Sequence, residues 1–302
     1  MSEGGKRGLR LAVNSKVWNP TQSEWLKAGQ CIQPEEKDRI AGFHFKRDAK
    51  SAMIGRLLLR HGVSLLTGAP VRALRFGRTE KGKPYLLSPV DKQTPRCDIS
   101  FNISHQGDFV VLAAESGRTV GVDVMKVEWT RPTKIADFLL SLKRQLTTAE
   151  WAQVESRQKD MDQLAAFYRF WCLKESYVKA LGVGIGFEVS RLDFSLLTPE
   201  LNVGKVTKDT KLKVDCNAVT DWSFQESILS CPGQPHHVVA VAVRDDGQSK
   251  DECEMKSQSP EELFSELDAV TLLSKSEPLV GAVVDRAFWE DFSGRREEPG
   301  MR

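Results

Sequence analysis

The chain has 302 residues, of which 40% are hydrophobic and 28% are charged, so it can bury the core of one large domain or two smaller ones. No segment approaches the roughly 18 consecutive apolar residues of a membrane span, and the first residues lack the apolar stretch of a signal peptide. The six cysteines show neither Cys-x-x-Cys pairs nor zinc-site spacing with histidine. We therefore expect a soluble protein of the cytosol with reduced thiols and no membrane partner.

The net charge of +2 conceals an asymmetry between the body of the chain and its last residues. Residues 246–302 carry seven Lys/Arg against fourteen Asp/Glu, and residues 1–245 carry 36 against 27. A body of charge +9 attracts polyphosphates or an acidic protein. Without a basic stripe interleaved with aromatic residues, we expect no nucleic-acid partner. We predict that residues 246–302 form an acidic, largely disordered tail and that residues 1–13 are flexible.

In chain order, the first periodic pattern predicts a helix at residues 46–66. The remaining elements follow from alternation, turn residues and helical spacing. They are two extended pieces around a turn at 78–84, strands at 99–104, 109–114 and 119–125, a linker at 131–133, two or three helices within 135–182, and strands near 187–196 and 237–244. The order of a helix followed by strands in each half, with a weak echo between residues 108–114 and 237–243, hints at a duplicated unit.

Glu175 is unusual for its place in the last predicted helix. The apolar stripe of this helix comprises Leu164, Phe167, Trp171, Val178 and Leu181, and Glu175 falls inside it, on the side predicted to face the core. Because an unpaired buried charge is costly, Glu175 either forms a structural ion pair or lines a polar cleft as a metal ligand or base. Lys179, one turn later, could be an intrahelical partner worth about 0.2–0.5 kcal/mol.

Asp123 interrupts a run of β-branched residues that otherwise suits a buried strand. A strand holds a carboxylate rigidly, and Mg²⁺ binds through one or two acids together with substrate phosphates. The alternative is an aspartate at a strand edge or turn.

Two further segments offer polar groups. One is the strand end Asn102-Ile103-Ser104-His105, and the other is the loop Arg78-Thr79-Glu80-Lys81-Gly82-Lys83, whose glycine permits close backbone approach and whose cations suit phosphate. Each alone is also typical of a solvated turn. In combination with the two carboxylates, they indicate phosphoryl chemistry.

These segments resemble the Sfp-type 4'-phosphopantetheinyl transferases, in which a Gly-x-Asp strand precedes a Trp-x-x-Lys-Glu-(Ser/Ala)-x-x-Lys helix. Here the motifs are residues 121–123 and 171–179, and the resemblance extends to residues 33–39, 82–84 and 101–105. It covers about residues 14–245 and is closest to the vertebrate branch of the family. One departure is Met125, where many members have a second acid, because a thioether is a poor Mg²⁺ ligand and water would have to complete the coordination.

The resemblance implies an α+β monomer of two similar α/β lobes related by pseudo-twofold symmetry, residues 14–125 and 126–245, each a small antiparallel sheet packed with helices. It implies transfer of the 4'-phosphopantetheine arm of coenzyme A to a serine of apo acyl-carrier or peptidyl-carrier domains, with release of adenosine 3',5'-bisphosphate. The acceptors would belong to fatty acid synthase and to proteins of the aminoadipate-semialdehyde dehydrogenase type.

The resemblance also implies residue roles. Asp123 and Glu175 would hold Mg²⁺, Glu175 would take the serine proton, and Lys179 would steady the phosphates. Contacts to coenzyme A would come from Arg39, Arg78, Thr79, Glu80, Lys81, Gly82, Lys83, Asn102, Ile103, Ser104, His105, Glu175 and Lys179. Two other readings remain open on the residues alone, a Mg²⁺-dependent pyrophosphate or nucleotide hydrolase and a non-catalytic coenzyme A binding module.

Overall fold

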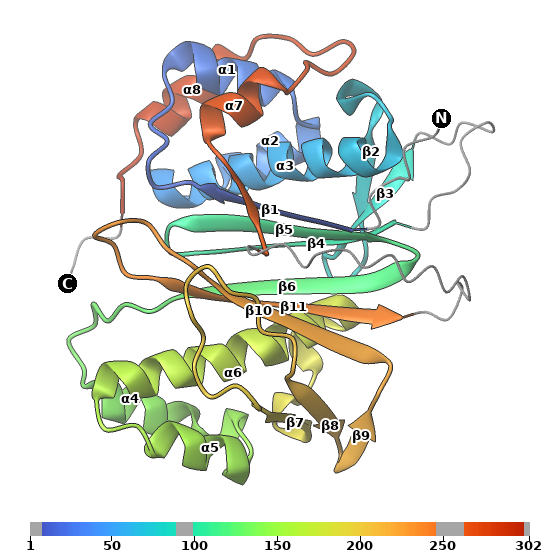
Figure 1. Cartoon of the computed structure of the whole chain (residues 1–302). Helices are drawn as coiled ribbons and strands as arrows, with labels where there is room; N and C mark the ends of the chain where they lie inside the picture. The colour runs from blue at the N-terminus through green and yellow to red at the C-terminus, as the bar shows by residue number, and fades with distance from the viewer. Residues whose placement is uncertain (1–7, 89–98, 246–262, 299–302) are drawn as a thin grey trace.

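The computed structural model describes residues 8–88, 99–245 and 263–298, and Figure 1 shows two sheets lying between two groups of helices. The first sheet has the strand order β12-β1-β5-β4, and the second has the order β10-β11-β6. Their strands are β1 (Gly8–Asn14), β4 (Ile99–Gln106), β5 (Phe109–Ser116), β12 (Ser265–Leu267), β6 (Arg118–Lys126), β10 (Trp222–Leu229) and β11 (His237–Asp245). All pairings are antiparallel except β1 with β12.

One group of helices covers the first sheet. It consists of α1 (Gln22–Gln30), α2 (Pro34–Ala41), α3 (Lys46–Thr67), α7 (Ala269–Ser274) and α8 (Arg286–Ser293). The predicted helix at 46–66 is confirmed by α3, which buries Met53, Leu57 and Leu58 and ends at Gly68 in the left-handed conformation. A short 3-10 turn (Val71–Ala73) then leads into a hairpin of β2 (Arg75–Arg78) and β3 (Pro84–Ser88), as expected around the turn at 78–84.

The second group covers the second sheet and confirms the expectation of up to three helices within residues 135–182. Its elements are α4 (Ile135–Leu142), α5 (Thr148–Glu155), α6 (Asp160–Leu181), β7 (Leu192–Ser195), β8 (Lys211–Val214) and β9 (Asn217–Val219), with 3-10 turns at Lys143–Gln145, Gly184–Gly186 and Val189–Arg191. The strand expected over 187–196 is shorter in the structure, because Val189–Arg191 form a 3-10 turn and only Leu192–Ser195 form the strand.

Three expectations need correction. Residues 8–13, expected to be flexible, form most of β1, which is an inner strand of its sheet. The disordered tail is wrong for residues 263–298, because α7 and α8 pack on the first lobe, and Phe292 stacks on Trp25 with ring centroids 3.7 Å apart. The lobe boundary after residue 125 is misplaced, because β6 pairs along its whole length with β11 of the second lobe. Residues 1–7, 246–262 and 299–302 lie outside the described residues.

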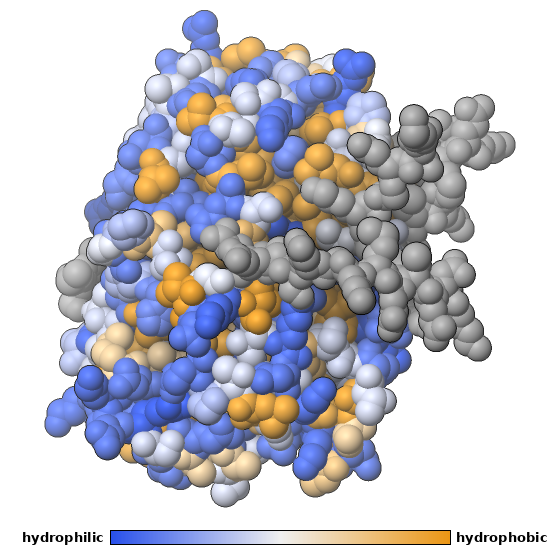
Figure 2. Space-filling view, in the orientation of Figure 1, coloured by the Kyte–Doolittle hydropathy of each residue, from blue (hydrophilic) through white to orange (hydrophobic). Residues whose placement is uncertain are grey.

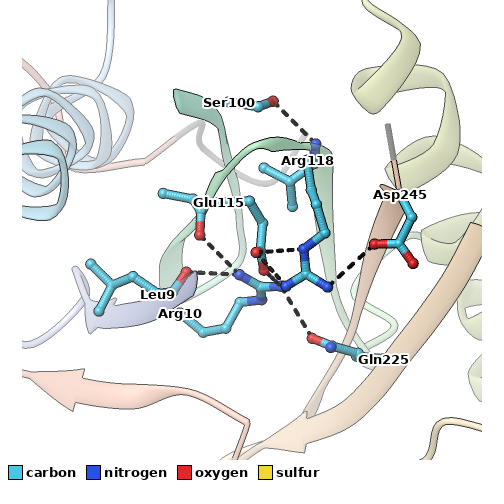
Figure 3. A network of polar contacts seen from close by, with 9 residues as sticks. Leu9, Arg10, Ser100, Glu115, Arg118, Gln225 and Asp245 are labelled. Atoms are coloured by element: carbon cyan, nitrogen blue, oxygen red, sulfur yellow. Dashed lines mark hydrogen bonds and ion pairs between the residues drawn. The ribbon is translucent and has the colours of Figure 1, made fainter. Parts of the chain in front are cut away.

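The two sheets pack face to face through small and β-branched side chains, including Val111, Val122 and Val241. At one end of this interface, a buried ion pair joins Arg10 of β1 to Glu115 of β5, with 2.6 Å between Nη2 and Oε1. Arg118 of β6 also binds Glu115, and Arg10 donates to Gln225 of β10 (Figure 3). This network therefore links strands of both sheets and fixes one lobe against the other.

Over the face shown in Figure 2, hydrophobic residues are interspersed with hydrophilic ones. Among the described residues, no helix combines the length and the apolar character needed to cross a bilayer.

His237, at the start of β11, makes stability depend on pH. Its ring is buried, and Nε2 accepts a hydrogen bond of 3.0 Å from the amide of Asp108, which requires the neutral imidazole. Burial lowers the pKa of His237 from 6.5 to about 4. Because the unfolded chain takes up the proton first, the free energy of unfolding should fall by about 3 kcal/mol as the pH decreases from about 6.5 to about 4.

Urea unfolding at pH 7, 5 and 4 measures this dependence, and His237→Gln should remove most of it. An equal loss of stability in native protein and variant would contradict the assignment to His237.

Candidate active site

A cavity of about 860 Å³ opens between the two lobes. One wall comes from α2, α3, the β2–β3 hairpin and β4, and the other comes from β6, α6 and the segment that follows it. The structure brings together at this cavity most of the residues named from the sequence, namely Arg39, Arg78, Lys81, Gly82, Lys83, Asn102, Ile103, Ser104, His105, Asp123, Glu175 and Lys179.

Thr79 and Glu80 are not part of the cavity lining. Thr79 instead shapes the turn, because its amide donates to the carbonyl oxygen of Lys83 (2.9 Å) and its hydroxyl accepts from the amide of Lys83 (3.1 Å). Gly82 has φ of 84°, a left-handed conformation that favours glycine. The turn thus directs Lys81 and Lys83 to the cavity while Glu80 stays exposed at its tip.

Close contact between α6 and β6 creates the centre of the site. A Cβ at Gly121 would collide with the carbonyl oxygen of Ser176 and the amide nitrogen of Ala180, so glycine lets the helix lie directly on the strand. Asp123, two residues later on β6, consequently meets Lys179 of α6, with 2.5 Å between Oδ1 and Nζ. Spacing on the helix suggested a pair between Glu175 and Lys179, whereas Lys179 pairs with the strand.

Ser104 of β4 completes this group. Its hydroxyl donates to Oδ1 of Asp123 (2.8 Å) and accepts from Nζ of Lys179 (2.9 Å). The strand end predicted at residues 102–105 therefore holds the aspartate from the first lobe, while Lys179 holds it from the second. The Asp123 carboxylate on β6 is thus fixed by β4 and by α6.

The second oxygen of Asp123 makes the site suitable for a cation. Oδ2 is buried and has no hydrogen-bond partner among the residues that the structure describes. Glu175 is half-buried at the cavity, and burial, followed by the negative charge of Asp123, raises the pKa of its carboxyl above the usual value. The carboxylates of Asp123 and Glu175 repel each other, and together they offer the hard oxygen ligands that Mg²⁺ takes.

Within residues 8–88, 99–245 and 263–298, no three His, Cys, Asp or Glu side chains gather at one point. The protein therefore offers two carboxylates here, and Met125, which lines the same cavity, adds no oxygen ligand. Water and substrate oxygens must supply the remaining coordination of any bound Mg²⁺.

The predicted core-facing stripe of α6 is only partly right. Leu164, Phe167 and Val178 are buried, but Trp171 and Glu175 line the cavity and Leu181 is exposed. The fully buried charge on α6 is Lys174, which belongs to the motif at residues 171–179 but received no role from the sequence.

Lys174 binds Glu150 of α5, with 2.8 Å between Nζ and Oε2. The same ammonium donates to the carbonyl oxygens of Val189 (3.0 Å) and Leu192 (2.5 Å). Val189 lies at the cavity, so Lys174 anchors α6 to the segment that closes one side of the site.

Arg56 is a second residue that sequence reasoning missed. This residue of α3 lines the cavity with Arg39 and Arg78. Burial lowers the pKa of Arg56 to about 10, although Glu36, 3.7 Å away, opposes the shift. Glu36 also pairs with the buried Arg60 at 3.1 Å, so the three guanidinium groups at the cavity leave an excess of positive charge suited to a phosphate.

Lys83 and His105 contribute in different ways. Nζ of Lys83 donates to the carbonyl oxygen of Ala180 (2.7 Å) in the last turn of α6, so this side chain crosses from one lobe to the other. The side chain of His105 keeps an exposed surface at the cavity, and partial removal from water, followed by the charge of Lys179, lowers the pKa of its imidazole, which favours the neutral form at pH 7. His105 can therefore contribute hydrogen bonds but no charge.

Comparison with known proteins agrees with this geometry. Residues 16–117 match the family model described as 4'-phosphopantetheinyl transferase, N-terminal, and residues 119–242 match the 4'-phosphopantetheinyl transferase superfamily. The border between the two matches coincides with the start of β6, the first strand of the second lobe.

Relatives from distant organisms match over most of their length. The chain is 41% identical to the L-aminoadipate-semialdehyde dehydrogenase-phosphopantetheinyl transferase of Homo sapiens. The alignment spans 295 residues, which are 97% of this chain and 93% of the relative. It is 32% identical to the phosphopantetheinyl transferase of Thraustochytrium sp., over 77% of each chain, and 27% identical to the 4'-phosphopantetheinyl transferase of Bacillus subtilis, over 60% and 76%. The chain therefore belongs to the 4'-phosphopantetheinyl transferase family, whose activity is to transfer phosphopantetheine from coenzyme A to carrier proteins.

Proposed function

We propose that this transferase works with Mg²⁺ held by Asp123 and Glu175, and that Glu175 also takes the proton from the acceptor serine. The observation that carries the proposal is the unpartnered, buried Oδ2 of Asp123 next to a carboxyl group whose pKa is raised. Bound there, Mg²⁺ would neutralise charge on the pyrophosphate oxygens.

The reaction is a displacement at phosphorus that needs no covalent enzyme intermediate. The serine oxygen bonds to the phosphorus that carries the pantetheine arm, the bond from that phosphorus to the oxygen of adenosine 3',5'-bisphosphate breaks, and the serine proton passes to Glu175. Lys179, held at the cavity by Asp123 and Ser104, offers positive charge to the leaving phosphate. Most of the catalytic effect would come from positioning.

We propose that coenzyme A lies along the first-lobe wall of the cavity. Arg39, Arg78 and the missed Arg56 would neutralise its phosphates, with Lys81 and Lys83 from the hairpin. The strand end at residues 102–105 would supply hydrogen bonds, with His105 neutral. Thr79 would act indirectly by holding the turn, and Glu80 would not touch the substrate.

The acceptors proposed are apo acyl-carrier and peptidyl-carrier domains, including those of fatty acid synthase and of proteins of the aminoadipate-semialdehyde dehydrogenase type. The name of the human relative supports the second class. The positive charge of residues 1–245 would steer an acidic carrier surface to the cleft. We further propose a cytosolic monomer.

The pseudo-twofold relation between the lobes also remains a proposal. In its support, α3 and α6 each have 22 residues, and each ends at a glycine with φ near 70°. Each also packs on the sheet of its own lobe.

An intact-mass assay tests the proposed function. The protein is incubated with coenzyme A, Mg²⁺ and an apo acyl-carrier domain, with a carrier whose acceptor serine is replaced by alanine as control. We expect the mass of the carrier to increase by one phosphopantetheine, only when the serine is present and not in excess EDTA. Release of adenosine 3',5'-bisphosphate without a mass gain would favour the hydrolase, and coenzyme A binding with neither product would favour the binding module.

A further inference from the structure

The helix α8 packs against α2, the helix that contributes Arg39 and Ile40 to the cavity (Figure 1). Asp285, which caps α8, binds Lys37 of α2 with 3.0 Å between the carboxylate and Nζ. Lys37 itself is not among the residues that line the cavity. The helix is therefore held between the cavity and the C-terminal segment.

Residues 295–297 bind both ends of the junction between α2 and α3. The guanidinium of Arg295 donates to the carbonyl oxygens of Ile40 (3.0 Å) and Ala41 (2.8 Å), which end α2. The carbonyl oxygens of Arg296 and Glu297 accept from the amides of Lys46 (2.8 Å) and Arg47 (3.2 Å), which begin α3. These are groups that a helix end leaves without an internal partner.

The side chains at this junction do not supply those bonds themselves. Phe45 stands at the N-cap of α3 and makes no side-chain cap hydrogen bond. A helix of eight residues, such as α2, is also too short to be stable without tertiary contacts. The C-terminal segment therefore helps to fix α2 and Phe43, which lies just after it at the cavity wall, alongside the buried ion pair between Glu36 of α2 and Arg60 of α3 (3.1 Å).

We propose that residues 295–297 are a positioning element of the coenzyme A site. By fixing the α2–α3 junction, they hold Arg39 and Phe43 where the proposed binding mode needs them. The inference rests on the proposed placement of coenzyme A along α2.

The test compares Arg295→Ala with native protein by calorimetric titration of coenzyme A and by steady-state kinetics of the full chain. We expect Arg295→Ala to raise the Kd and KM for coenzyme A by up to about tenfold. The KM for the carrier and kcat at saturating coenzyme A should stay unchanged, and amide hydrogen exchange should quicken at residues 41–47. Arg295→Lys, which keeps a donor, should recover part of the affinity.

Arg244→Ala is the matched control, because Arg244 also pairs with an aspartate, Asp221, and it does not line the cavity. Unchanged coenzyme A affinity in Arg295→Ala would overturn the proposal, as would an equal loss in every kinetic parameter. Arg39→Ala distinguishes the proposed placement of coenzyme A from the positioning role of residues 295–297. If it leaves coenzyme A binding intact, the proposed placement fails; if it weakens binding while Arg295→Ala does not, only the positioning role fails.

Discussion

Replacing Glu175 by glutamine, or Asp123 by asparagine, is expected to lower the rate of phosphopantetheine transfer by about 10²–10⁴-fold. Glutamine at position 175 cannot take the serine proton, and each change removes a charged oxygen ligand from the proposed metal site. Neither side chain supports the hydrophobic core, because Glu175 lines the cavity and Asp123 interacts with Ser104 and Lys179. The variants should therefore stay folded.

Single-turnover rates with saturating coenzyme A and carrier measure this loss, and circular dichroism checks the fold. Glu155→Gln is the matched control, because Glu155 is an exposed residue of α5 outside the cavity. A folded variant at position 123 or 175 with near-native turnover would remove that residue from the mechanism.

Replacing Lys174 by alanine should lower the free energy of unfolding by about 3–5 kcal/mol, because it leaves the Glu150 carboxylate buried without its cation. Burial raises the pKa of Glu150 and lowers that of Lys174, so removal from water outweighs their mutual attraction. The carbonyl oxygens of Val189 and Leu192 would also lose a donor.

Denaturant unfolding of Lys174→Ala and of the double variant Lys174→Met, Glu150→Gln tests this explanation. Glutamine removes the charge at position 150 but can still accept from the amides of Thr147 or Phe194, so the double variant should recover much of the loss. A change below about 0.5 kcal/mol in Lys174→Ala, the size usual for surface sites, would show that the pair does not anchor α6.

Periodicity in the sequence was enough to locate several of the elements that frame the site, but not α2, which carries Arg39. The long helix α3, the strands β4, β5 and β6 and the three helices of the second lobe have regular apolar spacing, which each segment displays by itself. The positions of the two motifs on β6 and α6 follow from the same patterns.

The ends of the chain could not be predicted in this way. The C-terminal segment has an acidic average composition, which predicts exposure. Phe288 and Phe292 are nevertheless buried, because they stack on Trp25, a residue more than 260 positions earlier in the chain. The register of β1 likewise depends on its neighbours β5 and β12. Burial and strand register of this kind depend on residues far away in the sequence, so the local sequence pattern does not reveal them.

Within the site, the sequence located residues by motif but misjudged their surroundings. The cavity position of Arg56 and the full burial of Lys174 were missed because a charged residue in an amphipathic helix is normally assigned to solvent. The partner of Lys179 was unpredictable for a related reason, because it depends on the close approach that Gly121 allows.

Metal binding tests the central claim of the mechanism without relying on activity. Calorimetric titration of Mg²⁺ in the presence of coenzyme A would compare native protein with Asp123→Asn, Glu175→Gln and the control Glu155→Gln. We predict that binding is weakened by at least about tenfold in the first two variants and unchanged in the control. Equal affinity for Mg²⁺ in all four proteins would contradict the assignment of Asp123 and Glu175 as its ligands.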